Sequence, residues 1–86
     1  MVSIRSVTPQ SGRRLEVLFD NGHSVTLDFT SRLRTVRFGR FKDEEFFKQA
    51  ATDGDFVRWN RLIEISANEV FQLAQKEWNV NVEKHA

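Results

Sequence analysis

The stretch LEVLFDNGHSVTLDF, residues 15–29, decides the fold. Two runs of alternating apolar residues flank Asp20, Asn21, Gly22 and His23, a pattern typical of two antiparallel strands joined by a tight turn. The same four residues allow a second interpretation, because an Asp and a His beside a Gly could bind a metal or form an acid/base pair. The register of the two strands decides between the two interpretations, since one register gives the turn residues a structural role.

A two-residue loop, Asn21-Gly22, would place three apolar residues of the first strand opposite three polar residues of the second. A three-residue loop, Asp20-Asn21-Gly22, instead pairs Phe19 with His23. This second register gives one apolar face made of Leu15, Val17, Phe19, Val25 and Leu27. We therefore predict a type I turn with a bulge and Gly22 in the left-handed conformation, so that Asp20, Asn21 and Gly22 are structural turn residues.

The remaining elements follow from apolar spacing, caps and breakers along the chain. Asp43 is typical of a helix N-cap, Asp53-Gly54 of a helix end, and Ser66 with Glu69 of a capping box. The predicted elements are strands at 2–7, 14–19 and 23–29, a helix between 43 and 53, a hairpin of 56–59 and 62–65 around Asn60-Arg61, and a helix from residue 66. The order β-β-β-α-β-β-α predicts an α+β fold. We expect a small, mostly antiparallel sheet of two hairpins plus an N-terminal strand, with two helices.

Length and composition favour a single domain over residues 1–86, with residues 79–86 expected to fray at the C-terminus. The chain has no cysteine, so neither a disulfide nor a thiolate metal site supports the small core. We expect such a core to be completed by a protein partner or by a second copy of the chain. No signal peptide or membrane-length apolar run is present, which predicts a cytoplasmic protein without a membrane partner.

The connection at residues 31–41 has no clear period, and we expect an irregular segment with a short strand at 35–38. It belongs to the most basic part of the chain. Its cations are Arg32, Arg34, Arg37, Arg40 and Lys42, interleaved with Val36, Phe38 and Phe41. Such a stretch could hold phosphates or stack bases. Two alternatives remain: the cations pair with the more acidic second half of the chain, or they bind an acidic protein.

No motif predicts an enzyme, because the chain has no Gly-rich phosphate loop, no nucleophile arrangement and no metal-ligand spacing. Asp43, Glu44 and Glu45 suit the first turn of a helix better than a metal site. Trp59 and Trp78 fit core packing better than a ligand platform. We therefore expect no catalytic residue, no bound metal and no cofactor.

Four segments together resemble a small bacterial family, domain of unknown function 2442. They are LEVLFDNG, LDF, FGRFKDEEFF and FVRWNRLIEISANEVF, and the resemblance spans roughly residues 4–73. The resemblance implies a small α+β domain and no catalytic residue. Some members of that family are encoded beside a partner in arrangements that resemble toxin–antitoxin pairs. The leading hypothesis is a non-enzymatic protein-interaction module, antitoxin-like or regulatory, acting as a homodimer or with a protein partner. The alternative is a nucleic-acid-binding accessory protein that uses the basic stretch 32–42.

Overall fold

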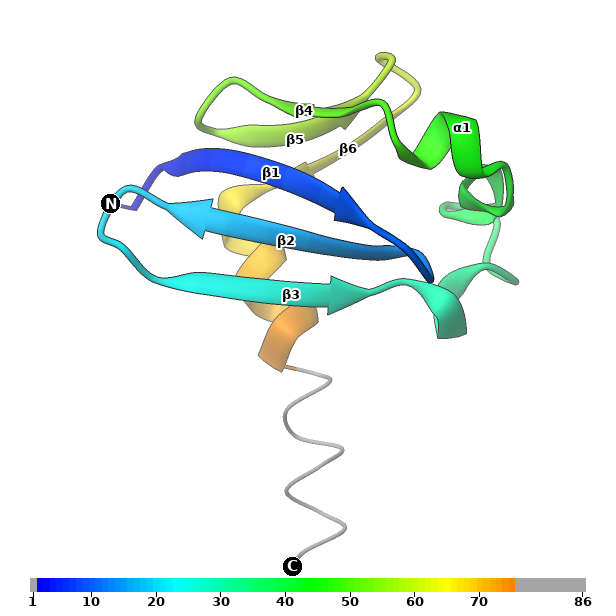
Figure 1. The fold of residues 1–86 in the computed structure, drawn as a ribbon, viewed down its shortest axis with the longest axis horizontal. Coiled ribbons are helices and arrows are strands. Elements are labelled where there is room, and N and C mark those ends of the chain that lie inside the picture. Colours follow the sequence, from blue (N-terminus) through cyan, green and yellow to red (C-terminus); the bar gives the residue numbers. More distant parts are fainter. Residues whose placement is uncertain (1, 76–86) are drawn as a thin grey trace, which may run out of the picture.

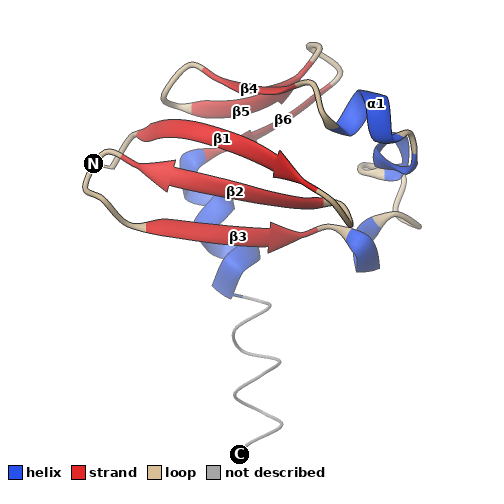
Figure 2. Ribbon diagram, in the orientation of Figure 1, coloured by secondary structure: helices blue, strands red, loops and turns tan. Residues whose placement is uncertain are grey.

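Two three-stranded antiparallel sheets make up the fold in a computed structural model, which describes residues 2–75 (Figures 1 and 2). The first sheet has the order β1 (Ile4–Gln10), β2 (Arg14–Phe19), β3 (Ser24–Asp28). The second has the order β4 (Ala50–Thr52), β5 (Phe56–Trp59), β6 (Ile63–Ser66). A C-terminal helix begins at residue 67 and continues through residue 75. The predicted α+β class is confirmed.

The connection from β3 to β4 contains three short helical turns. These are η1 (Thr30–Arg32), η2 (Gly39–Lys42) and α1 (Glu44–Phe47). They lie together at one side of the molecule, beyond the ends of the first sheet (Figure 1). The C-terminal helix lies against the inner face of the first sheet, where Phe71 stacks on Phe19 with ring centroids 4.5 Å apart.

The predicted register of the β2–β3 hairpin is confirmed. Val17 pairs with Val25 and Leu15 with Leu27, and the Phe19 amide donates to the His23 carbonyl at 2.8 Å. Gly22 has a φ of 89°, in the left-handed region that Gly adopts at little cost. The turn is a fold determinant because a shift of the register by one residue would exchange the inner and outer faces of β3.

An aromatic cluster forms the centre of the core. Phe29, Phe41 and Trp59 are fully buried and Phe47 is 1% exposed. The rings of Phe41 and Trp59 lie 4.6 Å apart between centroids. The Trp59 indole Nε1–H donates to the Phe47 carbonyl at 3.0 Å, so its one polar group is satisfied inside the core. Trp59 is therefore a core residue, as predicted, whereas Trp78 lies outside the described residues.

The helix predicted between residues 43 and 53 is shorter than expected. Its N-cap is confirmed, since the Asp43 carboxylate accepts from the amides of Glu45 and Phe46, but α1 ends at Phe47. Residues 50–52 form strand β4, which pairs with β5. Pairing with β5 supplies hydrogen bonds that outweigh the helix propensity of two alanines, because a helix of one turn has little stability of its own. The strands consequently form two sheets, where one was expected.

Two smaller predictions also differ from the structure. The first strand starts at Ile4 and extends through Pro9, which an edge strand tolerates because no partner needs the missing amide hydrogen. Residues 35–38 form turns and not a strand, because the Thr35 amide and hydroxyl both bond to the Arg32 carbonyl, at 3.1 and 2.7 Å. These local bonds replace a strand ladder.

Candidate nucleic-acid interface

The basic stretch lies on the connection between β3 and β4, which is anchored to the core and to the β1–β2 turn. Phe38 and Phe41 are 4% and 0% exposed and pack on Phe29 in the core. Between β3 and Phe38 the chain turns outward, and the Phe38 amide donates to the Thr35 hydroxyl oxygen at 3.2 Å. Val36 stands at this turn with its side chain fully exposed, at 103% of the reference area. The connection therefore presents an apolar side chain to solvent on a hydrogen-bonded turn.

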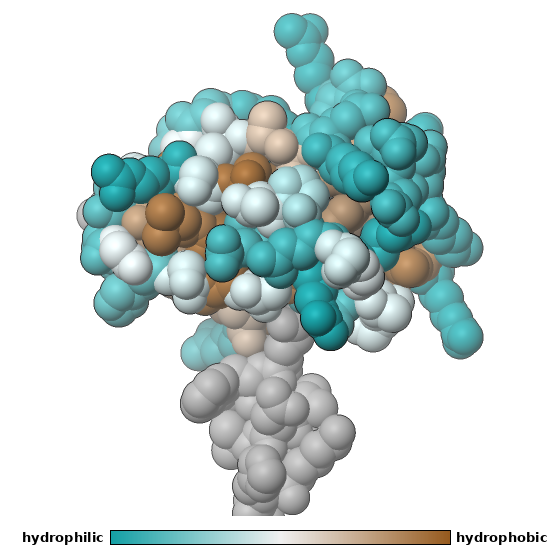
Figure 3. Space-filling view, viewed as in Figure 1, coloured by the Kyte–Doolittle hydropathy of each residue, from teal (hydrophilic) through white to brown (hydrophobic). Residues whose placement is uncertain are grey.

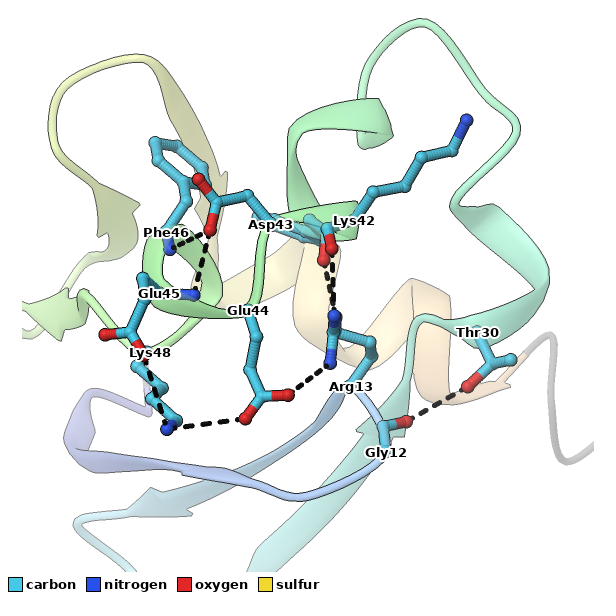
Figure 4. A network of polar contacts seen from close by, with 10 residues as sticks. Gly12, Arg13, Thr30, Lys42, Asp43, Glu44, Glu45, Phe46 and Lys48 are labelled. Carbon is cyan, nitrogen blue, oxygen red and sulfur yellow. Dashed lines mark hydrogen bonds and ion pairs between the residues drawn. The ribbon is translucent and has the colours of Figure 1, made fainter.

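Arg13, in the β1–β2 turn, holds the far end of the connection (Figure 4). Its guanidinium donates to the Phe41 carbonyl at 2.6 Å and to the Lys42 carbonyl at 2.9 Å, and it contacts the Glu44 carboxylate at 3.3 Å. The backbone of Arg13 has a φ of 61°, unusual for a residue other than Gly. Arg13 is not among the predicted site residues, because a turn residue gives no signal of a contact 28 positions away.

Two of the five predicted cations have structural partners. The Arg37 guanidinium binds both carboxylate oxygens of Glu69 on the C-terminal helix and donates to the Glu64 carbonyl at 3.0 Å. These contacts raise the pKa of Arg37, chiefly through the hydrogen bond to Glu69. Arg32 donates to the Asp28 carbonyl at 3.3 Å. Arg37 therefore ties the connection to the helix, as the alternative of pairing with the acidic second half predicts.

Arg34, Arg40 and Lys42 differ from Arg37. All three side chains are exposed and form no ion pair or hydrogen bond with any part of the chain between residues 2 and 75. We call Arg34, Val36, Arg40 and Lys42 the cationic surface. A hollow of about 230 Å³ lies beside it, bordered by Arg40 and Lys42 and by Asp43, whose carboxylate is engaged as the cap of α1.

The arginines outside the cationic surface are largely neutralised by carboxylates. Arg58 on β5 pairs with Asp53 and with Glu64, and Arg14 lies 3.7 Å from Asp28. Arg5 and Arg61 are exposed, but they lie in separate places, on β1 and in the β5–β6 loop. Hydrophilic residues predominate on the side of the molecule where the connection and α1 lie, with a few hydrophobic ones among them (Figure 3). The cations of the basic stretch without a carboxylate partner in residues 2–75 all lie on the connection between β3 and β4.

The residues considered as candidates for a metal or acid/base site lie in the β2–β3 turn, at the start of α1 or outside the described residues. Asp20 and His23 are exposed at the β2–β3 turn, and the Asn21 side chain accepts from the His23 amide at 3.0 Å. Within residues 2–75, no group of three or more His, Cys, Asp or Glu side chains is placed to hold a metal ion. His85 lies outside the described residues. None of the helices in the described part is long and apolar enough to cross a membrane.

Comparisons with known proteins identify the fold and little more. No protein-family model matches the chain, and no curated protein matches it. A similar solved structure is the crystal structure of a protein from Nitrosomonas europaea ATCC 19718 that is described as a putative DNA binding protein. The TM-score is 0.75 at 19% sequence identity, over 92% of this chain and 52% of that one. This chain therefore shares its fold with a structure of which it spans about half.

Proposed function

We propose that this domain is a non-enzymatic binding module that holds nucleic acid through Arg34, Arg40 and Lys42. The observation that carries the proposal is their lack of a carboxylate partner within residues 2–75, while Arg37 in the same stretch has one. A cation without a protein partner can neutralise a phosphate and release a counterion without first breaking an ion pair. Arg37 is excluded from this role, because recruiting it would leave Glu69 without that partner.

The fold comparison supports the proposal. The similar solved structure is described as a putative DNA binding protein, and its fold includes nearly the whole of this chain. The proposed role is an accessory one, in which a few cations add to the affinity of other contacts. Three cations alone give weak binding, and its affinity falls as the salt concentration rises, because each phosphate contact contributes about 0.9 to the salt slope.

Fluorescence anisotropy with labelled nucleic acid at about 50 mM salt tests the proposal. The variant Arg34→Ala/Arg40→Ala removes two cations of the cationic surface. A matched control, Arg5→Ala/Arg61→Asn, removes two exposed cations elsewhere, with Asn chosen because Arg61 has a φ of 62°. We expect the slope of log affinity against log salt to fall by about 2 in the first variant and by much less in the control. Equal losses in both variants, or no binding by the wild type, would contradict the proposal.

A second candidate, protein interaction or self-association, is supported by a different feature. Strand β3 is the last strand of its sheet, and its outer edge pairs with no strand in the described part of the chain. Ser24 and Thr26 are exposed on it, so an edge-to-edge pair of two copies meets no charged side chain at these positions. The predicted antitoxin-like or regulatory role and the domain of unknown function 2442 resemblance belong to this candidate.

Light scattering after size-exclusion chromatography tests self-association. We expect a dimer at micromolar concentration that becomes a monomer in Ser24→Lys/Thr26→Lys, because two copies then place like charges together along the shared edge. A wild-type monomer that also retains no partner in a pull-down with the product of the adjacent gene would rule out the second candidate.

A further inference from the structure

We infer that the cationic surface is built for double-stranded DNA, with Val36 entering a groove, and not for single-stranded nucleic acid. This inference rests on the proposed function and narrows the ligand class of the same site. Proteins that hold single strands without sequence preference stack bases on exposed aromatic rings. The two aromatic residues of the basic stretch, Phe38 and Phe41, are 4% and 0% exposed, so neither presents a ring to a base.

The apolar side chain that the basic stretch exposes to solvent is small and aliphatic. Val36 is fully exposed, and the cations Arg34 and Arg40 lie on either side of it in the sequence. An exposed apolar side chain on a stretch that also carries cations unpaired within residues 2–75 suits a duplex groove, which has phosphates along both rims and base edges on its floor. There a valine contacts a thymine methyl group in the major groove, or lies against a base step in the minor groove.

The turn that carries Val36 is held in place before any ligand binds. The Thr35 hydroxyl donates to the Arg32 carbonyl at 2.7 Å and accepts from the Phe38 amide at 3.2 Å. Arg37, next to Val36, is fixed by both oxygens of Glu69. An ordered loop loses little conformational entropy on binding, so the energy of the contacts is retained as affinity.

The same bonds favour DNA over RNA. A wide RNA minor groove displays 2′-hydroxyl groups, which need polar partners on the protein. At the tip of the turn the Thr35 hydroxyl already donates one hydrogen bond and accepts another, and the side chain of Val36 has no polar atom. The side chains at the tip therefore gain little from a 2′-hydroxyl and fit the less polar wall of a deoxyribose groove.

The test measures the full chain by anisotropy against three labelled probes of equal length at one salt concentration: a DNA duplex, the same DNA as a single strand, and an RNA duplex. We expect the DNA duplex to bind at least about 5-fold more tightly than either of the others. Val36→Ser should weaken duplex binding by about 5-fold without changing the salt slope, because it removes apolar contact and no phosphate contact. Val36→Ile serves as the matched control and should bind as well as the wild type.

Each outcome decides the inference. Single-stranded DNA or duplex RNA binding as tightly as duplex DNA would overturn it and leave the proposed function standing. Unchanged duplex affinity in Val36→Ser would overturn it as well. No binding to any probe would overturn the proposed function and this inference together. Because Val36 is fully exposed, the substitutions should leave the thermal unfolding temperature unchanged, which a melting curve verifies.

Discussion

Arg13 gives the sharpest prediction about stability, because one side chain joins the β1–β2 turn to the connection before α1. Arg13→Ala removes two hydrogen bonds to carbonyls, at 2.6 and 2.9 Å, and a contact to Glu44 at 3.3 Å. Each charge-assisted bond contributes about 1 kcal/mol once its partial exposure is taken into account. The ion pair adds about 0.5 kcal/mol, since Glu44 is more than half exposed. The expected loss of unfolding free energy is about 2.5 kcal/mol.

The backbone of Arg13 supplies an internal control. Arg13→Gly removes the same side-chain contacts but also relieves the backbone strain of a residue other than Gly at a φ of 61°. This relief recovers about 1 kcal/mol of unfolding free energy. Arg13→Gly should therefore destabilise the domain by only about 1.5 kcal/mol. Urea unfolding followed by circular dichroism measures both values, and in a domain of this size the Ala variant should melt about 10–15 °C below the wild type. A loss of unfolding free energy below about 0.5 kcal/mol in Arg13→Ala would refute the stabilising role of the Arg13 side-chain contacts. Equal losses in the two variants would refute the strain of the Arg13 backbone.

Two further predictions concern the first sheet. Gly22→Val should destabilise the domain by about 2 kcal/mol, because a β-branched residue is strained at a φ of 89°, while nucleic-acid binding by the folded fraction stays unchanged; equal unfolding midpoints in urea would contradict this. Asp28 has a lowered pKa, first through its hydrogen bonds with Thr30 and then through Arg14. Its folded pKa lies below the unfolded value, so its contribution is present above about pH 4 and is lost as the pH falls through the folded pKa. Asp28→Asn should cost at most about 1 kcal/mol at pH 7 and progressively less below pH 4, and a cost independent of pH would disprove the assignment.

Features that depend on residues near one another in the chain can be predicted from the sequence. The alternation in residues 15–29 selects the register of β2 and β3, because the three-residue loop places the apolar side chains on one face and the two-residue loop does not. The Asp43 cap and the Ser66 cap follow from the same local logic, and the Ser66 hydroxyl accepts from the Glu69 amide at 3.1 Å. Strand β4 escaped prediction because its three residues carry no period of their own and are fixed by pairing with β5.

Which cations of the basic stretch lack a carboxylate partner within residues 2–75 is seen only in the folded structure. Arg34 and Arg37 look equivalent in the sequence, yet Arg37 meets Glu69, 32 positions away, and Arg34 meets no acidic side chain within residues 2–75. Burial likewise becomes clear only in the fold. In the sequence Phe38 and Phe41 are candidates for base stacking because they lie among cations, but in the structure both are buried in the core. Ion pairing and burial depend on distances in space between residues far apart in the chain. Composition therefore indicates where a binding surface can lie, and packing selects the side chains that remain to form it.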